Sequence, residues 1–498
     1  MIAGAVFAIA AVVITGAMAL ELSGARERAG TTTPAAEVAA GVVLLAVTGT
    51  IVISAGGRVT LTLFYVVFGL VVAAGALRWV RRRAAGPVRG PGEAEGAGEG
   101  GEVRMVGRGG TAAAASRDRV AAVLIVAAAV VWLALLVAAS RDRLAWDGWA
   151  IWTFKARVLF DEGTLPPAVL DPTGAYAFAH PEYPLAVPLL DWWIYRHAGA
   201  ARPALLSMLG ASWFGLLPIL MWRATRPYAG QRRAALATLG VTTFWPISFY
   251  AIGGYADVLI TVATLGAVIE LERLATEPDR RGAVRLAWFL ALAAVAKNEG
   301  LVLALIGSVV GAWLLWRGGV RRAGTFAVLV LPFAAAAPWL WTVWRLRLEP
   351  HHLAGARPGV LEALGRVPDI VGALIELGTT RSWIPLPWLI LLGVLLVARK
   401  ARATSRASWL FLGGYSLAFL TVYVVTPLDP NWLIGSTLDR LVGMVIPAAV
   451  LLTVREVGSL GREVAGATGG SRAARAVPSA SSVSSVRSLH SDSAVSSD

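Results

Sequence analysis

Long apolar blocks separated by short polar stretches dominate the 498-residue chain. Most blocks run for about 17 to 25 residues, the length at which a helix crosses a hydrocarbon core of roughly 30 Å. We therefore predict an all-α polytopic membrane protein with about thirteen transmembrane helices and a long first outer loop. The expected spans are 2–20, 37–55, 60–79, 120–140, 203–222, 233–251, 254–272, 284–298, 300–316, 324–346, 383–398, 406–426 and 437–454.

Basic residues gather in the short loops on one side of these predicted helices. A single orientation puts every basic cluster on the same face, and basic loops face the cytoplasm. We therefore expect a multi-pass protein of the cell membrane, with its N-terminus outside and its C-terminus in the cytoplasm. The clusters contain Arg78, Arg81, Arg82 and Arg83; Arg223, Arg226, Arg232 and Arg233; Arg280, Arg281 and Arg285; Arg317, Arg321 and Arg322; and Arg399, Lys400, Arg402 and Arg406.

The composition agrees with a membrane protein. Hydrophobic residues make up 57% of the chain and charged residues 15%, whereas a soluble domain carries about 25% charged residues. The formal charge of +14 suggests nucleic acid at first, but the arginines are accounted for as orientation signals, so we expect membrane lipids and no nucleic acid as partners. The absence of cysteine excludes disulfides and thiolate metal sites.

Composition also divides the chain into four stretches. Three apolar helices form 1–80, a Gly-, Glu- and Arg-rich flexible cytoplasmic linker forms 81–118, a helical core forms 119–457, and a Ser-rich cytoplasmic tail, predicted to be disordered, forms 458–498. The first apolar block lacks a basic n-region, so we interpret it as a transmembrane helix rather than a signal peptide.

Two long stretches, 141–201 and 348–382, fall on the predicted outer face. Loops of this length are usually functional or disordered. The first is rich in Trp, Tyr and Pro, which favours order, and we expect its Trp192, Trp193 and Tyr195 at the membrane surface. The second contains an adjacent His351–His352 pair. A lone histidine pair is weak evidence for a metal site, and we predict neither a metal nor a cofactor.

The first outer loop contains the run Trp146-Asp147-Gly148-Trp149, followed by Lys155. A carboxylate held among aromatic rings at the membrane surface is suited to act as a general base, because desolvation makes it more basic. Asp147 is therefore our catalytic candidate and Lys155 a substrate-binding candidate. The alternative, an interfacial aromatic belt with one solvated aspartate, stays open.

Further along the same loop lies the segment His180-Pro181-Glu182-Tyr183-Pro184. Closely spaced prolines favour an extended, turning chain. Glu182 is suited to be a second acid or an acceptor for a substrate hydroxyl, and we include His180 and Tyr183 as substrate-binding candidates. Equally, the prolines can serve only to shape the loop.

Three more ionisable positions interrupt apolar sequence at the outer edge. Asp257 follows a Gly-Gly-Tyr-Ala segment, and Lys297 and Glu299 flank Asn298 between two short predicted helices. Ionisable groups at membrane depth usually pair or line a polar cavity. We treat all three as substrate-binding candidates; the alternatives are a helix N-cap for Asp257 and a mutual ion pair for Lys297 and Glu299.

Arg440 lies near the outer end of the last predicted span. The planar guanidinium binds two oxygens at once, which suits a phosphate. Arg440 is therefore a further substrate-binding candidate. The alternative is an internal ion pair with Asp439 or Asp429.

Taken in order, the segments WDGWAIWTFKARVLF, HPEYPLAVPLL, GYAD, KNEG and W-x-x-x-S-T-L-D-R resemble the GT-C superfamily of membrane glycosyltransferases. The branch that they resemble most contains bacterial protein mannosyltransferases and aminoarabinose transferases. The resemblance covers roughly residues 119–455. It implies a GT-C-like catalytic core that transfers a sugar from a polyprenyl-phosphate donor to an envelope polysaccharide, lipid or protein on the outer face.

The resemblance also implies roles for individual residues. Asp147 matches the acidic residue that activates the acceptor, and Arg440 and Lys297 are candidates for binding the lipid-linked phosphate. The family often has two adjacent acids in this loop, whereas Asp147 is followed by Gly148. A second acid is then expected elsewhere, with Asp161, Glu162 and Glu182 as candidates.

Two other classes of function compete with this one. A transporter or flippase of a lipid-linked sugar needs charged residues through the bilayer and often has an internal repeat, which the sequence does not display. A non-catalytic relative that kept only the fold is the second, because fold alone does not establish activity.

Overall fold

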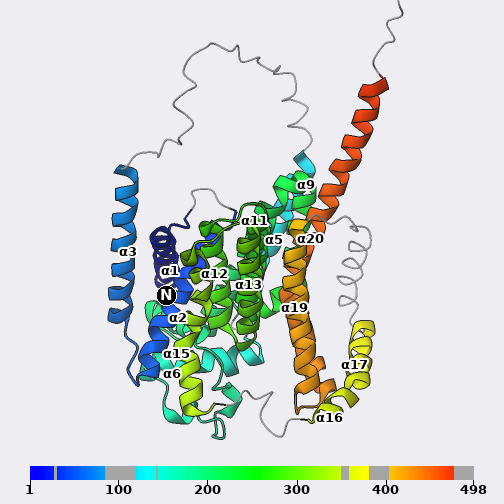
Figure 1. Cartoon of the computed structure of the whole chain (residues 1–498). Helices are drawn as coiled ribbons and strands as arrows, with labels where there is room; N and C mark the ends of the chain where they lie inside the picture. The colour runs from blue at the N-terminus through cyan, green and yellow to red at the C-terminus, as the bar shows by residue number, and fades with distance from the viewer. Residues whose placement is uncertain (27–30, 85–117, 142–143, 349–357, 381–402, 476–498) are drawn as a thin grey trace, which may run out of the picture.

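The computed structural model describes residues 1–26, 31–84, 118–141, 144–348, 358–380 and 403–475. These residues form helices and turns, without a strand among them. Figure 1 shows the long helices packed side by side, with α6 and α16 at the lower end. The helices are α1 (Ile2–Ser23), α2 (Thr33–Ser54), α3 (Leu61–Ala84), α5 (Arg119–Ala139), α6 (Phe154–Glu162), α7 (Ala186–Ala198), α8 (Pro203–Phe214), α9 (Leu216–Thr242), α10 (Trp245–Ile252), α11 (Asp257–Thr276), α12 (Arg280–Ala296), α13 (Asn298–Arg317), α14 (Ala323–Ala327), α15 (Leu331–Leu346), α16 (Val360–Gly365), α17 (Val367–Thr380), α19 (Ala403–Val425) and α20 (Pro430–Arg475).

The chain is a multi-pass α-helical membrane protein. Within the described ranges, nine helical runs are long and apolar enough to cross a membrane. The predicted spans 203–222 and 233–251 fall largely in one run, Pro203–Thr242, which is kinked at Gly230. α11 carries three charged residues in its last two turns and α12 has 17 residues, so neither is among the nine. The predicted span 383–398 and the His351–His352 pair lie outside the described residues.

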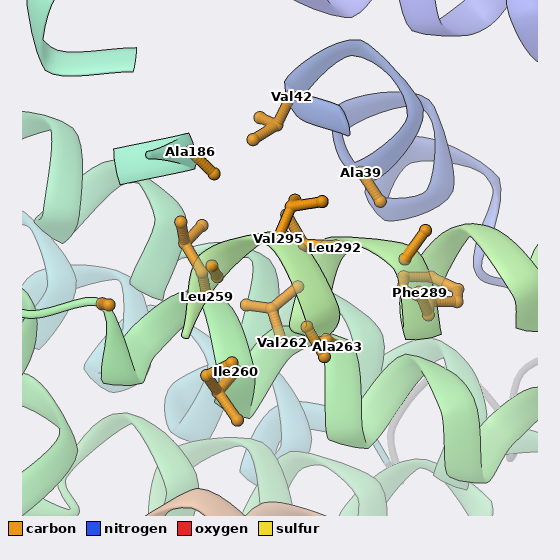
Figure 2. Packing of buried hydrophobic residues seen from close by; sticks show 14 of the residues in the cluster. Ala39, Val42, Ala186, Leu259, Ile260, Val262, Ala263, Phe289, Leu292 and Val295 are labelled. Carbon is orange, nitrogen blue, oxygen red and sulfur yellow. The ribbon is translucent and has the colours of Figure 1, made fainter. Parts of the chain in front are cut away.

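The centre of the molecule is formed by α11 and α12, which pack against each other and against α13, α2 and α15. Every residue of α12 from Gly282 to Ala296 is buried. Figure 2 shows this packing, with Ala39 and Val42 of α2 facing Leu292 and Val295 of α12. Small side chains allow these helices to approach closely, as is common in membrane interiors.

The three N-terminal helices pack into this body. α1 contacts α2, α3 and α7, and α2 contacts α12, α15 and α7. α1 and α2 meet at Gly16 and Gly41, where an added Cβ would lie 1.7 Å from the Glu37 carbonyl oxygen and 2.0 Å from that of Val12. The boundary at residue 80 thus separates these helices from the core in sequence but not in packing.

Two expectations differ from the structure. Trp192, Trp193 and Tyr195 lie in the core rather than at the membrane surface, because α1, α2 and α3 cover α7; the Trp193 indole even donates to the Ala8 carbonyl at 3.0 Å. The predicted disordered tail begins at 458, whereas α20 continues to Arg475. A formed helix adds further residues at little cost, since nucleation is the unfavourable step.

Buried polar side chains bind the C-terminal end of α11, the end far from Asp257, to neighbouring helices. Glu270 accepts from Arg285 of α12 at 2.9 Å and from the Thr32 hydroxyl. Glu272 binds Arg455 of α20 at 2.8 Å and the Ser408 hydroxyl of α19 at 2.5 Å. We call this set, Glu270, Glu272, Arg285 and Arg455, the inner cluster; it connects α11 to helices from both ends of the chain.

Candidate functional site

Five of the ionisable residues singled out in the sequence meet at the other end of α11. Asp147 precedes a short π-helix, η3 (Gly148–Thr153), and Asp257 is the first residue of α11. Lys297 sits in extended backbone between α12 and α13, Glu299 lies in the first turn of α13, and Arg440 lies on α20. We call these five residues the ionic cluster. π-Helical turns occur often at functional sites.

Arg440 is the centre of the ionic cluster. Its Nε and Nη2 donate to the two carboxylate oxygens of Asp257 at 3.1 and 2.9 Å, and its Nη1 donates to Asp147 Oδ2 at 2.6 Å. The Asp257 contact is the two-point geometry in which a guanidinium binds a carboxylate most strongly. Arg440 therefore holds together two acids that are 110 positions apart in the sequence.

Lys297 extends the cluster to Glu299. Its ammonium lies 2.9 Å from Glu299 Oε1 and 3.6 Å from Asp257 Oδ1. Glu299 Oε2 is buried, and it has no hydrogen-bond partner among the described residues. A buried carboxylate oxygen without a donor is costly, so this oxygen is a free acceptor in the site.

The cluster decides between the alternatives that the sequence left open. Lys297 and Glu299 do pair, but Lys297 also contacts Asp257. The N-cap interpretation of Asp257 is wrong, because Ala256 occupies the cap position and the Asp257 side chain faces Arg440. Arg440 pairs with Asp257 and Asp147 through its side chain, whereas Asp439 accepts from the Arg440 backbone N–H at 3.0 Å.

Gly148 explains why a second acid does not follow Asp147 directly. A Cβ at this position would lie 1.9 Å from the Gly253 carbonyl oxygen, so any side chain would force the two segments apart. Of the alternatives considered, Asp161 is exposed and pairs with Arg157 at 2.7 Å, and Glu162 is exposed as well. The carboxylate that shares Arg440 with Asp147 is Asp257, contributed by the Gly253–Asp257 segment that touches Gly148.

A second layer, formed by the 180–183 segment, lies beside the ionic cluster. The rings of Trp152 and Tyr183 stack at 5.5 Å and those of Tyr183 and His180 at 5.0 Å. Glu182 accepts from His180 Nδ1 at 3.0 Å. The Tyr183 hydroxyl is buried, and burial together with the nearby Glu299 carboxylate raises its pKa well above the usual value. Tyr183 therefore links the two layers as a neutral hydroxyl.

Lys155 binds the backbone of the 180–183 segment. Its side chain is fully buried, and Nζ donates to the His180 carbonyl at 2.6 Å. Burial lowers the pKa of Lys155 to about 7, with the Glu182 carboxylate opposing the shift. Lys155 thus holds the 180–183 segment in place instead of reaching the ionic cluster.

The structure adds two tyrosines that the sequence did not single out. The Arg440 guanidinium lies 4.8 Å from the ring centroid of Tyr255 and 5.9 Å from that of Tyr250. The faces of aromatic rings attract cations, so both rings restrain the guanidinium. The position of Tyr255 in the Gly-Tyr-Ala-Asp segment was the one available signal; nothing in the sequence around Tyr250 indicated a contact with a residue 190 positions away.

Exposed aromatic rings continue from Asp147 over the 146–178 segment. Trp146 and Trp149 pack edge to face at 4.9 Å, Trp149 meets Phe178 at 6.3 Å, and Phe178 meets Tyr176 at 6.4 Å. All four side chains are exposed. We call these four residues the aromatic surface; it begins next to the proposed base.

A small, mostly apolar cavity lies beside the Pro184–Leu185 segment. It lies between α2, α12, α13, α15 and the start of the 184–185 segment, and it is lined by Thr50, Pro184, Leu185, Val295, Leu301 and Trp339, among others. Pro184 follows Tyr183 and Leu301 is two residues from Glu299, but none of the five residues of the ionic cluster lines the cavity. For the described residues, no group of three His, Asp or Glu side chains is arranged to hold a metal ion.

Comparison with known proteins gives two solved structures. The chain is similar to ArnT from Cupriavidus metallidurans in the apo state, with 19% identity and a TM-score of 0.44, over 75% of this chain and 66% of that one. It is similar to the same protein bound to undecaprenyl phosphate, with 18% identity and a TM-score of 0.44, over 72% and 66%. The chain thus spans just under two thirds of those structures. No protein-family model and no curated protein matches the sequence.

Proposed function

We propose that this protein is a membrane glycosyltransferase that moves a sugar from a polyprenyl-phosphate donor to a cell-envelope acceptor at the outer face of the membrane. The observation that carries the proposal is the direct contact between Asp147 and Arg440 at one end of the helical body. Asp147 is a partly exposed carboxylate that is suited to act as a base, and Arg440 is a cation that is suited to bind a phosphate. A single hydrogen bond connects the two side chains.

The reaction needs few groups. The acceptor hydroxyl gives its proton to the Asp147 carboxylate while its oxygen attacks the anomeric carbon of the sugar. The bond between that carbon and the phosphate oxygen breaks, and the electron pair leaves on the prenyl phosphate. Arg440 and Lys297 stabilise the charge that develops on the departing phosphate. Because the donor already carries a good leaving group, no nucleotide is consumed.

The surroundings suit a sugar. Glu299 Oε2 has no hydrogen-bond partner among the described residues and is available to a sugar hydroxyl. The aromatic surface fits the apolar face of a sugar ring, since the negative ring face attracts polarised C–H groups.

The transporter alternative finds no support along the central helices. Between the two ends of α11, residues 258–268 are apolar or small apart from Thr261 and Thr264. Both hydroxyls donate to carbonyls of α11 itself, at 2.7 and 2.8 Å. A polar path for a sugar headgroup would need accessible polar groups at this depth.

The decisive experiment measures sugar transfer from a panel of polyprenyl-phosphate sugars by the purified full-length protein. We expect the wild type to transfer from at least one donor and Asp147→Asn to lose about 100- to 10,000-fold in rate, the usual contribution of a general base. Asp161→Asn, an exposed acid in the same loop, is the matched control and should keep full activity. Equal activity of Asp147→Asn and wild type would contradict the role of Asp147, and absence of transfer by the wild type would contradict the function.

A further inference from the structure

We infer that the donor phosphate binds by displacing Asp147 from Arg440, so that donor binding comes first and releases the base for the acceptor. This inference rests on the proposed function. It concerns the state in which the ionic cluster exists before substrate arrives, and it follows from the charges, contacts and burial of the five residues.

The ionic cluster has more negative than positive groups. Arg440 and Lys297 provide two positive charges, and Asp147, Asp257 and Glu299 provide three negative ones. Asp439 adds a further carboxylate close by, in contact with the Arg440 backbone and the Tyr250 hydroxyl. An anionic phosphate placed in this arrangement would meet net repulsion, so one carboxylate has to leave the cations.

The arrangement of the N–H groups of Arg440 also indicates that a phosphate replaces Asp147. Asp257 occupies the edge formed by Nε and Nη2. The other two-donor edge of a guanidinium consists of Nη1 and Nη2, and Nη1 is the nitrogen that Asp147 holds at 2.6 Å. A phosphate that binds two oxygens to the remaining edge therefore competes with Asp147 and leaves Asp257 in place.

Asp147 is also the acid that can leave. Asp257 makes two bonds to Arg440, lies 3.6 Å from Lys297, and exposes 3% of its side chain. Asp147 makes one bond to Arg440 and exposes 19%. It precedes a π-helical turn, and the aromatic surface beside it is open. Once Asp147 has left Arg440, one of its carboxylate oxygens can accept a hydrogen bond from the hydroxyl of the sugar acceptor.

The test is the equilibrium binding of undecaprenyl phosphate to the full-length protein in lipid nanodiscs. Because Asp147→Asn removes the competing charge, we expect it to bind the lipid phosphate about five- to tenfold more tightly than the wild type, while its transfer rate falls. Asp161→Asn should bind like the wild type. In the Arg440→Gln background, Asp147→Asn should have no effect, because the contested cation is gone.

Order of binding gives a second measurement that needs no variant. With the wild type, undecaprenyl phosphate should be a competitive inhibitor with respect to the donor. With respect to the acceptor, its inhibition should not be competitive. Active wild type together with unchanged or weaker binding by Asp147→Asn would overturn the exchange and leave the proposed function standing. Absence of both transfer and lipid-phosphate binding in the wild type would overturn the proposed function itself.

Discussion

The two ends of α11 both carry ion pairs, but these differ in their exposure and in their balance of charge. In the inner cluster, Arg285 and Glu270 expose 1% and 2% of their side chains, and the Thr32 and Ser408 hydroxyls and the Ala25 carbonyl contribute further bonds. In the ionic cluster, Arg440, Asp147 and Glu299 expose 13%, 19% and 20%. Acids outnumber cations there by three to two. Each cluster has one buried carboxylate oxygen without a hydrogen-bond partner among the described residues, Oε2 of Glu270 and Oε2 of Glu299.

This difference separates a structural role from a functional one. Buried ion pairs hold elements in register when their groups are bonded and closed to water. The inner cluster is closed to water and connects α11 to the loop between α1 and α2 and to α12, α19 and α20. An open cluster with surplus acid gains nothing for stability from the surplus, but it can exchange one partner for a substrate.

The largest effect should come from breaking the inner cluster. Arg285→Ala leaves Glu270 buried without its cation, and we expect a loss of about 3–5 kcal/mol in unfolding free energy, measured by equilibrium unfolding in mixed detergent micelles. Arg157→Ala, which removes an exposed i,i+4 pair, is the control and should change stability by less than about 1 kcal/mol. If Asp147→Ala cost as much stability as Arg285→Ala, the distinction between the two ends would fail.

A smaller effect, confined to activity, should follow from moving Asp147. In Gly148→Ala the new Cβ meets the Gly253 carbonyl oxygen, so the segment that carries Asp147 shifts relative to Arg440. Because a displacement of about 1 Å can cost roughly 100-fold in rate, we expect a loss of that order in the transfer assay. Gly240→Ala, with open space around it, should leave the rate unchanged; similar rates for the two variants would show that the close contact is unimportant.

The smallest effect concerns Lys155, a buried cation that binds a carbonyl instead of a carboxylate. Its pKa is lowered to about 7 by burial, whereas the unfolded chain keeps the ordinary value near 10.5. Between these values the unfolded state binds more protons, so the wild type becomes more stable as pH rises from 7, by about 1 kcal/mol between pH 7 and 8. Below pH 7 that difference levels off.

Lys155→Met has no such group and should lack this contribution. The measurement is the unfolding free energy of both proteins at pH 7 and pH 8, in the same detergent. A difference between wild type and variant that stays constant over this interval would mean that Lys155 remains charged in the folded protein.

Much of the candidate site was predictable because charged groups are rare at membrane depth. Asp257, Lys297, Glu299 and Arg440 stood out against apolar surroundings, and all four lie in the ionic cluster with Asp147. Tyr250 and Tyr255 did not stand out, since aromatic residues are ordinary in such helices. Glu270 and Arg285 were hidden for another reason: they look like the usual charged ends of membrane helices.

The sequence by itself determined that this is a helical membrane protein and which residues are costly to bury, because both follow from local composition. Only the tertiary structure decided which acid meets which cation. Arg440 lies 183 positions from Asp257 and 293 from Asp147, and no local pattern encodes such pairings. They depend on how α11, α20 and the η3 segment pack, down to the absence of a Cβ at Gly148.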